Sequence, residues 1–424
     1  MSSMIAVDEL QVGMFIHLDG GWLSHPFPLS SFRIASAEQI AVIRRLGLAQ
    51  VRWSAERSAQ ADDPTQAAAA LAAAVPAESK AQAAARRHRE LLAAQREAQQ
   101  QCERQFGEAA SAWRQAWDAA AARPAESRAQ SEALARALLD KMLVGDDIGI
   151  RLVAGSGGER TAAHALNVSV IGLLLGRSLG LAADEMLDLG VGALMHDLGK
   201  SELPERVRHL EVGASAAELS AYRDHVAKGV ALGKRMALAG GALAVIAQHH
   251  EHADASGFPQ RLAGERIALA SRIVALVNRY DNLCNPPTRV PPLTPHEAVA
   301  MLFAQGRGRY DAGVLNAFIR MMGVYPAGSL VQLTDDRFAL VVSVNSTRPL
   351  KPRVLVHDAK VARSDALLLD LEEAPDLGIR RSLGAGKLPA PALEYLDPRP
   401  RVHYYFEPLG RAAPAAQDDA LAVA

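Results

Sequence analysis

The sequence of 424 residues has few cysteines, few aromatic residues and no excess of charge of either sign. Its two cysteines, Cys102 and Cys284, are too few for a disulfide framework, and this favours a reducing compartment. The 46 basic residues against 47 acidic ones give a net charge of -1. Composition therefore offers no electrostatic reason for binding DNA or an anionic membrane.

Long apolar segments are also absent. No stretch reaches the roughly 18 apolar residues that a membrane-spanning helix needs. The N-terminus, MSSMIAVDEL, lacks the basic start and apolar core of a signal peptide. We therefore expect a cytoplasmic protein without a membrane span. Its length exceeds one average hydrophobic core, which predicts two or three domains.

The first third of the chain predicts two segments of different character. Residues 1–55 combine aromatic residues, glycines and short alternating runs, which indicate a small β-rich module with a tight turn near Asp19. A helix from Ser36 to Leu46 is expected inside it, since Ser36 can cap its start and a glycine follows its end. Residues 56–135 are rich in alanine, the best helix former, and predict a helical linker.

The remainder predicts a mainly α fold that ends in a β-rich extension. Residues 136–323 carry apolar residues at helical spacing throughout, which indicates an all-helical domain. Residues 324–408 contain three runs typical of short strands, at 329–333, 338–344 and 353–357. Residues 409–424 are small and polar and are expected to be flexible.

Histidine and aspartate concentrate in the helical segment. In chain order it contains His164, His196, Asp197, Lys200, His225, His249, His250, Glu251 and Asp254. Buried imidazoles and carboxylates are costly unless they are paired or bound to a metal. Neutral imidazoles with a carboxylate suit Fe, Mn or Zn, whereas a structural zinc site would require thiolates. In an adjacent His-Asp pair the carboxylate can bridge to a second ion, and two bridged ions are a recurring device for attacking phosphate esters.

Lys200 follows His196 by four residues and Asp197 by three, so on a helix all three project to one side. Beside a metal site, its ammonium could neutralise charge that develops on a phosphate. The alternative is a solvated charge near the end of a helix at Gly199.

Two motifs resemble those of the HD-GYP family, the metal-dependent phosphodiesterases that degrade cyclic di-GMP. The run from His249 to Pro259 fits the family pattern HHExxDGxGYP at both histidines, Glu251, Asp254, Gly257 and Pro259, and His196–Lys200 fits HDxGK. The resemblance covers about residues 161–323. More weakly, residues 12–27 resemble a module often found before this domain, and residues 325–356 are similar to a β extension that often follows it.

The resemblance implies roles for individual residues. The metal ligands would be His164, His196, Asp197, His225, His249, His250 and, through its amide oxygen, Asn278. Asp197 would bridge two divalent transition-metal ions (Fe, Mn or Zn) and act in catalysis with Lys200. Substrate contacts would come from Lys200, Asp254, Gly257 and Arg289, and Gly257 would supply an unusual backbone angle. The substitutions Ala255 for glycine and Phe258 for tyrosine are expected to be mild.

Three departures from the family pattern bear on catalytic competence. Asn278 stands where members carry an aspartate ligand, and an amide brings no negative charge. Arg160 stands where trinuclear members have a glutamate, so we expect two ions and no third. The substrate-contacting Arg-Pro-Tyr-Arg stretch is replaced by Pro287–Val290, in which Arg289 reaches a phosphate only after a shift in register.

The leading hypothesis is a cytoplasmic cyclic di-GMP phosphodiesterase that acts in bacterial second-messenger signalling through a metal-activated water. The rival hypothesis is a catalytically impaired regulatory module that binds nucleotide or signalling proteins. A third is hydrolysis of a different phosphorylated or cyclic nucleotide, because an HD metal core serves several such reactions.

Overall fold

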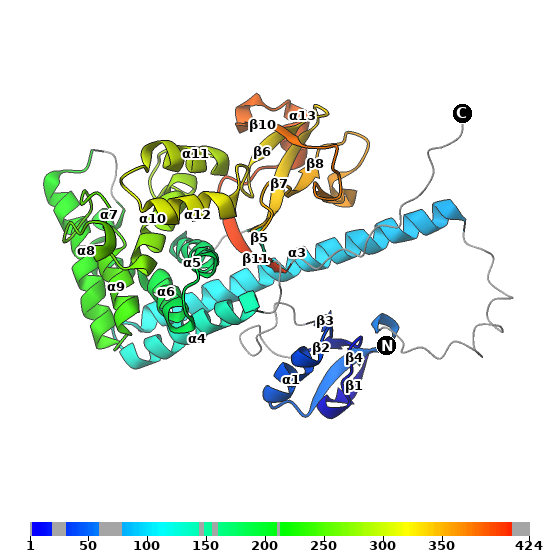
Figure 1. Cartoon of the computed structure of the whole chain (residues 1–424), viewed down its shortest axis with the longest axis horizontal. Helices are drawn as coiled ribbons and strands as arrows, with labels where there is room; N and C mark the ends of the chain where they lie inside the picture. Colours follow the sequence, from blue (N-terminus) through cyan, green and yellow to red (C-terminus); the bar gives the residue numbers. More distant parts are fainter. Residues whose placement is uncertain are drawn as a thin grey trace.

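The computed structural model describes residues 2–18, 31–58, 79–143, 148–154, 160–209 and 213–408. A small sheet module comes first, a long helix follows, and a helical domain and a second sheet pack along that helix (Figure 1). Within these residues no helix is both long and apolar enough to cross a membrane.

Over residues 2–18 and 31–58, the N-terminal module is an antiparallel four-stranded sheet with one covering helix. Its strands are β1 (Ser2–Ala6), β2 (Phe15–His17), β3 (Ser31–Arg33) and β4 (Gln50–Ser54), in the order β1-β4-β2-β3. Helix α1 (Ala37–Arg45) begins as predicted, because the Ser36 side chain accepts a hydrogen bond from the Gln39 backbone N–H. The module has its own core of buried aliphatic side chains, among them Ile16 and Ile43. The turn expected near Asp19 lies outside the described residues.

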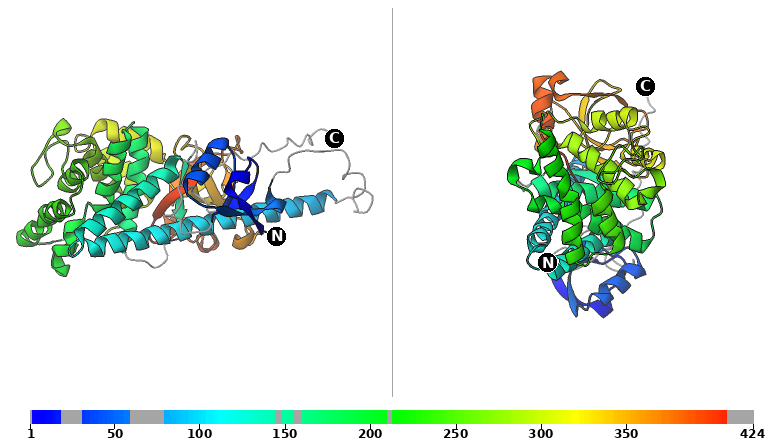
Figure 2. Two further views of the ribbon diagram at one scale, coloured as in Figure 1. Left: turned by 90° about the horizontal axis from the view of Figure 1, so that it is seen from below. Right: turned by 90° about the vertical axis from the view of Figure 1, so that its left-hand side faces the viewer.

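The alanine-rich segment forms two long helices, α3 (Lys80–Ala119) and α4 (Pro124–Leu143). The first half of α3 extends away from the helical domain, and the N-terminal module lies beside it (Figure 2). Its second half buries one face, from which Trp113 donates a hydrogen bond to the Leu194 carbonyl oxygen at 2.7 Å. The boundary expected at residue 135 falls inside α4, which shares the core of the helical domain.

In the part of the chain that the structure describes, eight further helices form the helical domain, with α5 at its centre (Figure 1). They are α5 (Arg160–Ser178), α6 (Ala183–Met195), α7 (Glu205–Arg208), α8 (Ala216–Arg235), α9 (Gly240–Gln248), α10 (Leu269–Cys284), α11 (Pro295–Gln305) and α12 (Ala312–Met322). The middle of α5 is buried without a break from Ala165 to Gly176, since α6, α10, α12 and a strand of the C-terminal sheet surround it. A helix enclosed on all sides needs apolar residues all round, as this one has.

The C-terminal sheet contains the three expected strands, β6 (Leu330–Leu333), β7 (Phe338–Asn345) and β8 (Arg353–Val356). It also contains β5 (Ile148–Val153), β9 (Leu369–Asp370), β10 (Ile379–Leu383) and β11 (His403–Pro408), and α13 (Ala390–Leu396) packs nearby. The strand order is β10-β6-β7-β5-β11, with β8 between β7 and β9.

The sheet corrects one expectation. The segment predicted to be helical throughout contributes β5, which pairs with β7 and β11 and ties the helical domain to the C-terminal extension. Its run Ile-Gly-Ile-Arg-Leu-Val is too short to separate a strand from a buried helix by periodicity. The predicted class, mainly α with small sheets near both ends, is confirmed.

Candidate metal centre

Six of the predicted ligands come together where four helices meet. His164 lies in the first turns of α5, His196 and Asp197 follow α6, His225 is on α8, and His249 and His250 follow α9. Two clusters of these side chains could each hold a metal ion. One contains His164, His196 and Asp197, and the other contains Asp197, His225, His249 and His250.

Asp197 belongs to both clusters, and its two oxygens face different ones. Its Oδ2 lies 3.9 Å from His164 Nε2 and 3.5 Å from His196 Nε2. Its Oδ1 lies 3.7 Å from both His225 Nε2 and His249 Nε2. This is the arrangement that a bridging carboxylate requires.

Four of the imidazoles are held in one tautomer by hydrogen bonds from Nδ1. His196, His225 and His249 donate from Nδ1 to the carbonyl oxygens of the residues three positions earlier, at 2.7, 2.5 and 2.9 Å. His164 donates from Nδ1 to Asp281 Oδ2 at 2.6 Å. With the proton on Nδ1, each Nε2 presents a lone pair, as a metal-ligating histidine must.

The lone pairs converge without a donor between them. The Nε2 atoms of His164 and His196 are 3.2 Å apart, and those of His225 and His249 are 3.3 Å apart. Asp197 Oδ1 and His250 Nε2 are buried and have no hydrogen-bond partner among the described residues. Acceptors packed this closely repel one another unless a cation lies among them, so this donor set of nitrogen and carboxylate oxygen fits a divalent transition-metal ion.

Burial keeps the ligands in the protonation state that a metal requires. It lowers the pKa of His196 to about 3 and that of His225 to about 4, and it lowers the pKa of His250 well below its ordinary value. Burial alone would raise the pKa of Asp197, but Lys200 and His196 outweigh it and hold that pKa well below the usual range. At neutral pH the imidazoles of His196, His225 and His250 are therefore uncharged and the Asp197 carboxylate is ionised.

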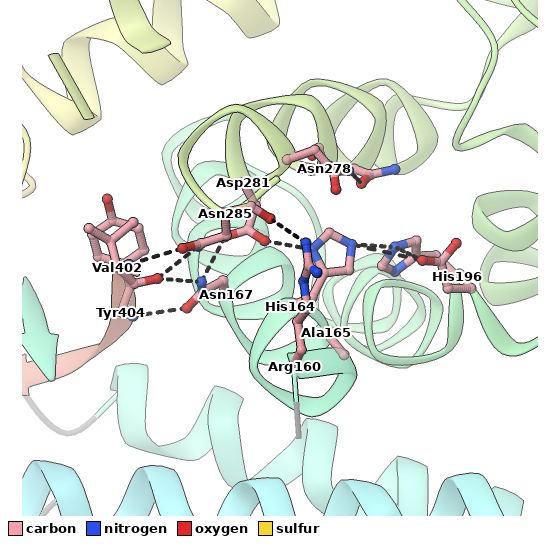
Figure 3. A network of polar contacts seen from close by, with 12 residues as sticks. Arg160, His164, Ala165, Asn167, His196, Asn278, Asp281, Asn285, Val402 and Tyr404 are labelled. Atoms are coloured by element: carbon pink, nitrogen blue, oxygen red, sulfur yellow. Dashed lines mark hydrogen bonds and ion pairs between the residues drawn. The ribbon is translucent and has the colours of Figure 1, made fainter. Parts of the chain in front are cut away.

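A polar network behind His164 connects the centre to the C-terminal strand (Figure 3). Asp281 Oδ1 accepts hydrogen bonds from the side-chain amides of Asn167 at 2.7 Å and Asn285 at 2.9 Å. Both amides also donate to the Val402 carbonyl oxygen, just before β11. The Asn167 amide oxygen accepts from the Tyr404 backbone N–H at 2.9 Å. Asp281 is thus fixed from both sides and in turn orients the His164 ring.

Lys200 lies against the shared carboxylate. Its Nζ is 2.6 Å from Asp197 Oδ2 and 5.3 Å from the centre of the Tyr222 ring. Burial would lower its pKa, but Asp197 and Tyr222 raise it above the ordinary value, so the ammonium stays charged. Gly199 makes this placement possible, because a Cβ there would lie 1.9 Å from the His225 carbonyl oxygen.

The segment from Glu251 to Pro259 forms a loop over His250. The buried carboxylate of Glu251 accepts from the backbone N–H groups of Gln260 at 2.6 Å and Leu262 at 2.9 Å, which closes the loop. The Phe258 ring stacks on His250 with centroids 4.5 Å apart. The ring retained by the tyrosine-to-phenylalanine change is therefore the part that packs on the site.

One expectation about this loop needs correction. Gly257 does not have the positive φ expected of it; it is required for space, since a Cβ would lie 2.5 Å from the His250 carbonyl oxygen. The unusual angle belongs to Ala255, whose φ is 62°. The glycine that the family pattern has there suits this conformation better, because a side chain in the left-handed region costs about 1 kcal/mol.

Two cavities border the centre. The larger, of about 510 Å³, lies beside His249 and His250. The smaller, of about 40 Å³, lies beside His164 and Asp197. Lys200 lines both.

Of the remaining predicted site residues, one lines a cavity of the centre and the others lie outside both cavities. Asn278 lines the larger cavity, and its Oδ1 accepts a hydrogen bond from the Asn282 side chain at 2.5 Å. Asp254 and Arg289 are exposed and line neither cavity, and Asp254 Oδ1 instead accepts from the Ser256 backbone N–H. Gly257 borders a separate surface groove with Arg223.

Sequence reasoning missed several residues that the fold brings to the site. Arg208, Tyr222 and Arg279 line the larger cavity, Arg401 lines the smaller, and His209 lines both. The presence of His209 among the clustered histidines was a signal, whereas a lone surface arginine gives none. Asp281 could have been found from its spacing, since it lies one helical turn after Asn278.

Comparison with known proteins matches two families. Residues 151–314 match the family described as "HD domain", and residues 2–131 match the "Domain of unknown function (DUF3391)". The chain is 28% identical over 371 residues to the cyclic di-GMP phosphodiesterase PA4108 of Pseudomonas aeruginosa, covering 84% of this chain and 85% of that protein.

Two further relatives match over a shorter part of the chain. The cyclic di-GMP phosphodiesterase response regulator RpfG of Xanthomonas campestris is 32% identical over 164 residues, which are 38% of this chain and 43% of that protein. The 3'3'-cGAMP-specific phosphodiesterase 2 of Vibrio cholerae is 32% identical over 154 residues, which are 36% of this chain and 29% of that protein.

Proposed function

Because the chain carries an HD domain with HD-GYP motifs behind a DUF3391 module, we propose that it hydrolyses a phosphodiester bond of cyclic di-GMP and so acts in second-messenger signalling. The names of its relatives support the substrate class, since each of the three described above is a cyclic-dinucleotide phosphodiesterase. The cytoplasm is the compartment in which we expect this activity.

The observation that carries the proposal is the shared carboxylate. Asp197 turns one oxygen to each ligand cluster, and each cluster borders its own cavity. A pair of sites bridged by one carboxylate is suited to in-line displacement at phosphorus, where both the attacking and the leaving oxygen need stabilisation. We propose that the two clusters hold two ions, Fe, Mn or Zn, with the six side chains as ligands and Asn278 at their edge.

When bound, these ions supply Lewis acidity that lowers the pKa of a coordinated water and offsets charge on the phosphate. The chain's own residues would hold the ions and orient the phosphate. Hydrogen bonds from Nδ1 keep the Nε2 lone pairs of the ligands directed at the centre. Lys200 places a fixed positive charge at the cavity wall, where it can stabilise charge that develops on the phosphate oxygens.

The larger cavity has the volume and lining for a nucleotide. Its 510 Å³ lies within the range of about 300–1,000 Å³ that small-molecule sites occupy. Arg208 and Arg279 contribute positive charge, and Leu293 and Met301 contribute apolar surface on which a base can pack. Arg289 lies outside this cavity, so we propose that Arg208 and Arg279 bind the phosphate in its place.

A specific observation supports the rival function, a regulatory module with impaired catalysis. Asn278 adds no charge to the centre, and its amide oxygen is already engaged by Asn282. The stretch at Pro287–Val290 brings Pro287, Thr288 and Val290 to the cavity but no arginine. Such a protein would bind cyclic di-GMP or a signalling partner without turning it over.

One experiment separates these functions. The full chain is purified without air, its Fe, Mn and Zn content is measured, and cyclic di-GMP turnover is assayed on the same sample. The phosphodiesterase predicts about two ions per chain and linear dinucleotide or GMP as product, both lost in Asp197→Ala. Metal with nucleotide binding but no turnover would establish the regulatory function, and a protein without transition metal after growth in each metal would refute the centre itself.

A further inference from the structure

The smaller cavity beside His164 has two arginines in its wall that form no ion pair among the described residues. Arg160 donates from its guanidinium to the carbonyl oxygens of Pro287 at 2.6 Å and Asn285 at 3.4 Å, and neither contact neutralises its charge. Arg401 makes no ion pair or hydrogen bond within the described parts of the chain. Arg160 is half-buried, and burial and the nearby Arg401 lower the pKa of its guanidinium while Asp281 raises it in part.

The two carboxylates of this cavity are engaged elsewhere. Asp197 is paired with Lys200, and Asp281 accepts hydrogen bonds from His164 and from two asparagines. Asp197 also faces the ligand clusters, so its charge is directed toward the metal centre. Asp281 offsets part of the Arg160 charge, but neither guanidinium has an ion-pair partner among the described residues, so the wall keeps positive charge that an entering anion would neutralise.

The size of the cavity limits the anion. One water molecule needs about 10–15 Å³ of such a cavity, so a volume of 40 Å³ has room for about three water molecules. That space accepts a terminal phosphate and excludes a nucleoside. Lys200, His209 and Pro287 line both cavities, so a group held in the smaller one can be continuous with a nucleoside in the larger one.

We propose that this cavity is a subsite for the phosphate monoester of a nucleotide, bound by Arg160 and Arg401 while the nucleoside extends into the larger cavity. The inference rests on the proposed function, because opening one phosphodiester of a cyclic dinucleotide leaves a monoester at the end of the linear product. A monoester carries close to two negative charges at neutral pH, and guanidinium groups match phosphate oxygens in charge and geometry. Product retention, and a second cleavage to mononucleotides, would follow from such a subsite.

Binding of GMP and guanosine to the metal-loaded full chain tests the proposal by calorimetry. GMP has the monoester but no phosphodiester bond to cleave, so the measurement does not depend on phosphodiesterase activity. We expect GMP to bind at least about tenfold more tightly than guanosine, which is the difference that one charge-assisted contact of about 1.5 kcal/mol produces. Arg401→Gln should remove about tenfold of the GMP affinity and leave guanosine unchanged.

Arg401 is the decisive position, because Arg160→Gln also removes two hydrogen bonds to the loop at Asn285–Pro287. Arg160→Lys keeps the charge and should retain part of the GMP affinity. Arg320→Gln, on the exposed last turn of α12, is the matched control for loss of one positive charge and should bind GMP like the wild type.

Equal GMP affinity in the wild type and Arg401→Gln would overturn the subsite, since the phosphate would then be held by the metal ions alone. Inorganic phosphate that binds as tightly as GMP with the same arginine dependence would refute the nucleotide assignment and identify a free-phosphate site. Arginine-dependent GMP binding in a protein that cleaves no cyclic di-GMP would refute the proposed function and leave the subsite in place.

Discussion

Asp281→Asn tests whether the network behind His164 controls one metal position. Asp281 accepts three hydrogen bonds, one from His164 and two from the amides of Asn167 and Asn285. An asparagine at this position has one acceptor oxygen and one amide group. If the oxygen faces His164, its amide meets two other amide donors; if it faces them, its amide meets the His164 Nδ1–H.

Either orientation weakens the first ligand cluster. In the second orientation the His164 proton is driven to Nε2, the atom that faces His196, and this removes the lone pair a metal would use. Changes to residues that orient metal ligands typically cost about 10–100-fold in affinity, which is about 1.4–2.7 kcal/mol. The second cluster shares only Asp197 with the first, so its affinity should change much less.

Competitive metal titration of the apo protein measures both positions. We expect two binding steps in the wild type, and in Asp281→Asn one step unchanged and the other weakened by about 10–100-fold. Nitrogen-15 NMR of the histidines reports the tautomer of His164 directly. Asp376→Asn, at an exposed position that lines neither cavity, controls for the loss of one negative charge. Two unchanged steps with the proton still on Nδ1 would refute the argument that Asp281 orients this ligand.

Lys200→Ala should keep metal stoichiometry and lower cyclic di-GMP turnover; equal loss of metal, measured by elemental analysis, would make Lys200 a structural residue. Asn278→Asp should tighten metal binding about tenfold, because a carboxylate with a full negative charge replaces an amide dipole. Charges a few Å apart interact by several kcal/mol at an effective dielectric of about 20. Unchanged metal titration curves would contradict this. Ala255→Gly should raise the free energy of unfolding by up to about 1 kcal/mol, measured by urea denaturation, because φ is 62° there. The apo protein should lose stability as the pH falls from about 6.5 toward 4. His196 and His225, with pKa values of about 3 and about 4, stay neutral in the folded chain, whereas their unfolded forms take up protons in this range. A free energy of unfolding that does not change over this pH range would contradict their burial.

Local sequence signals predicted the elements that depend on neighbouring residues. The start of α1 followed from one capping serine, and the strands β6, β7 and β8 followed from short runs bounded by turn residues. The strand β5 could not be separated from helix in this way, because its partners β7 and β11 lie about 190 and 250 residues further along the chain. Pairing over such distances is decided by the whole fold.

The sequence by itself determined the ligand types and the likeness to HD-GYP proteins, since His196–Lys200 and His249–Pro259 carry their chemistry in short fixed spacings. Only the tertiary structure decided how those ligands are used. It directs the two oxygens of Asp197 to different clusters, and it links His164 to β11 through Asp281. It also brings Arg401 to Arg160 across more than half the chain. Spacing along a helix fixes which side chains share a face, whereas the packing of distant elements fixes which faces meet.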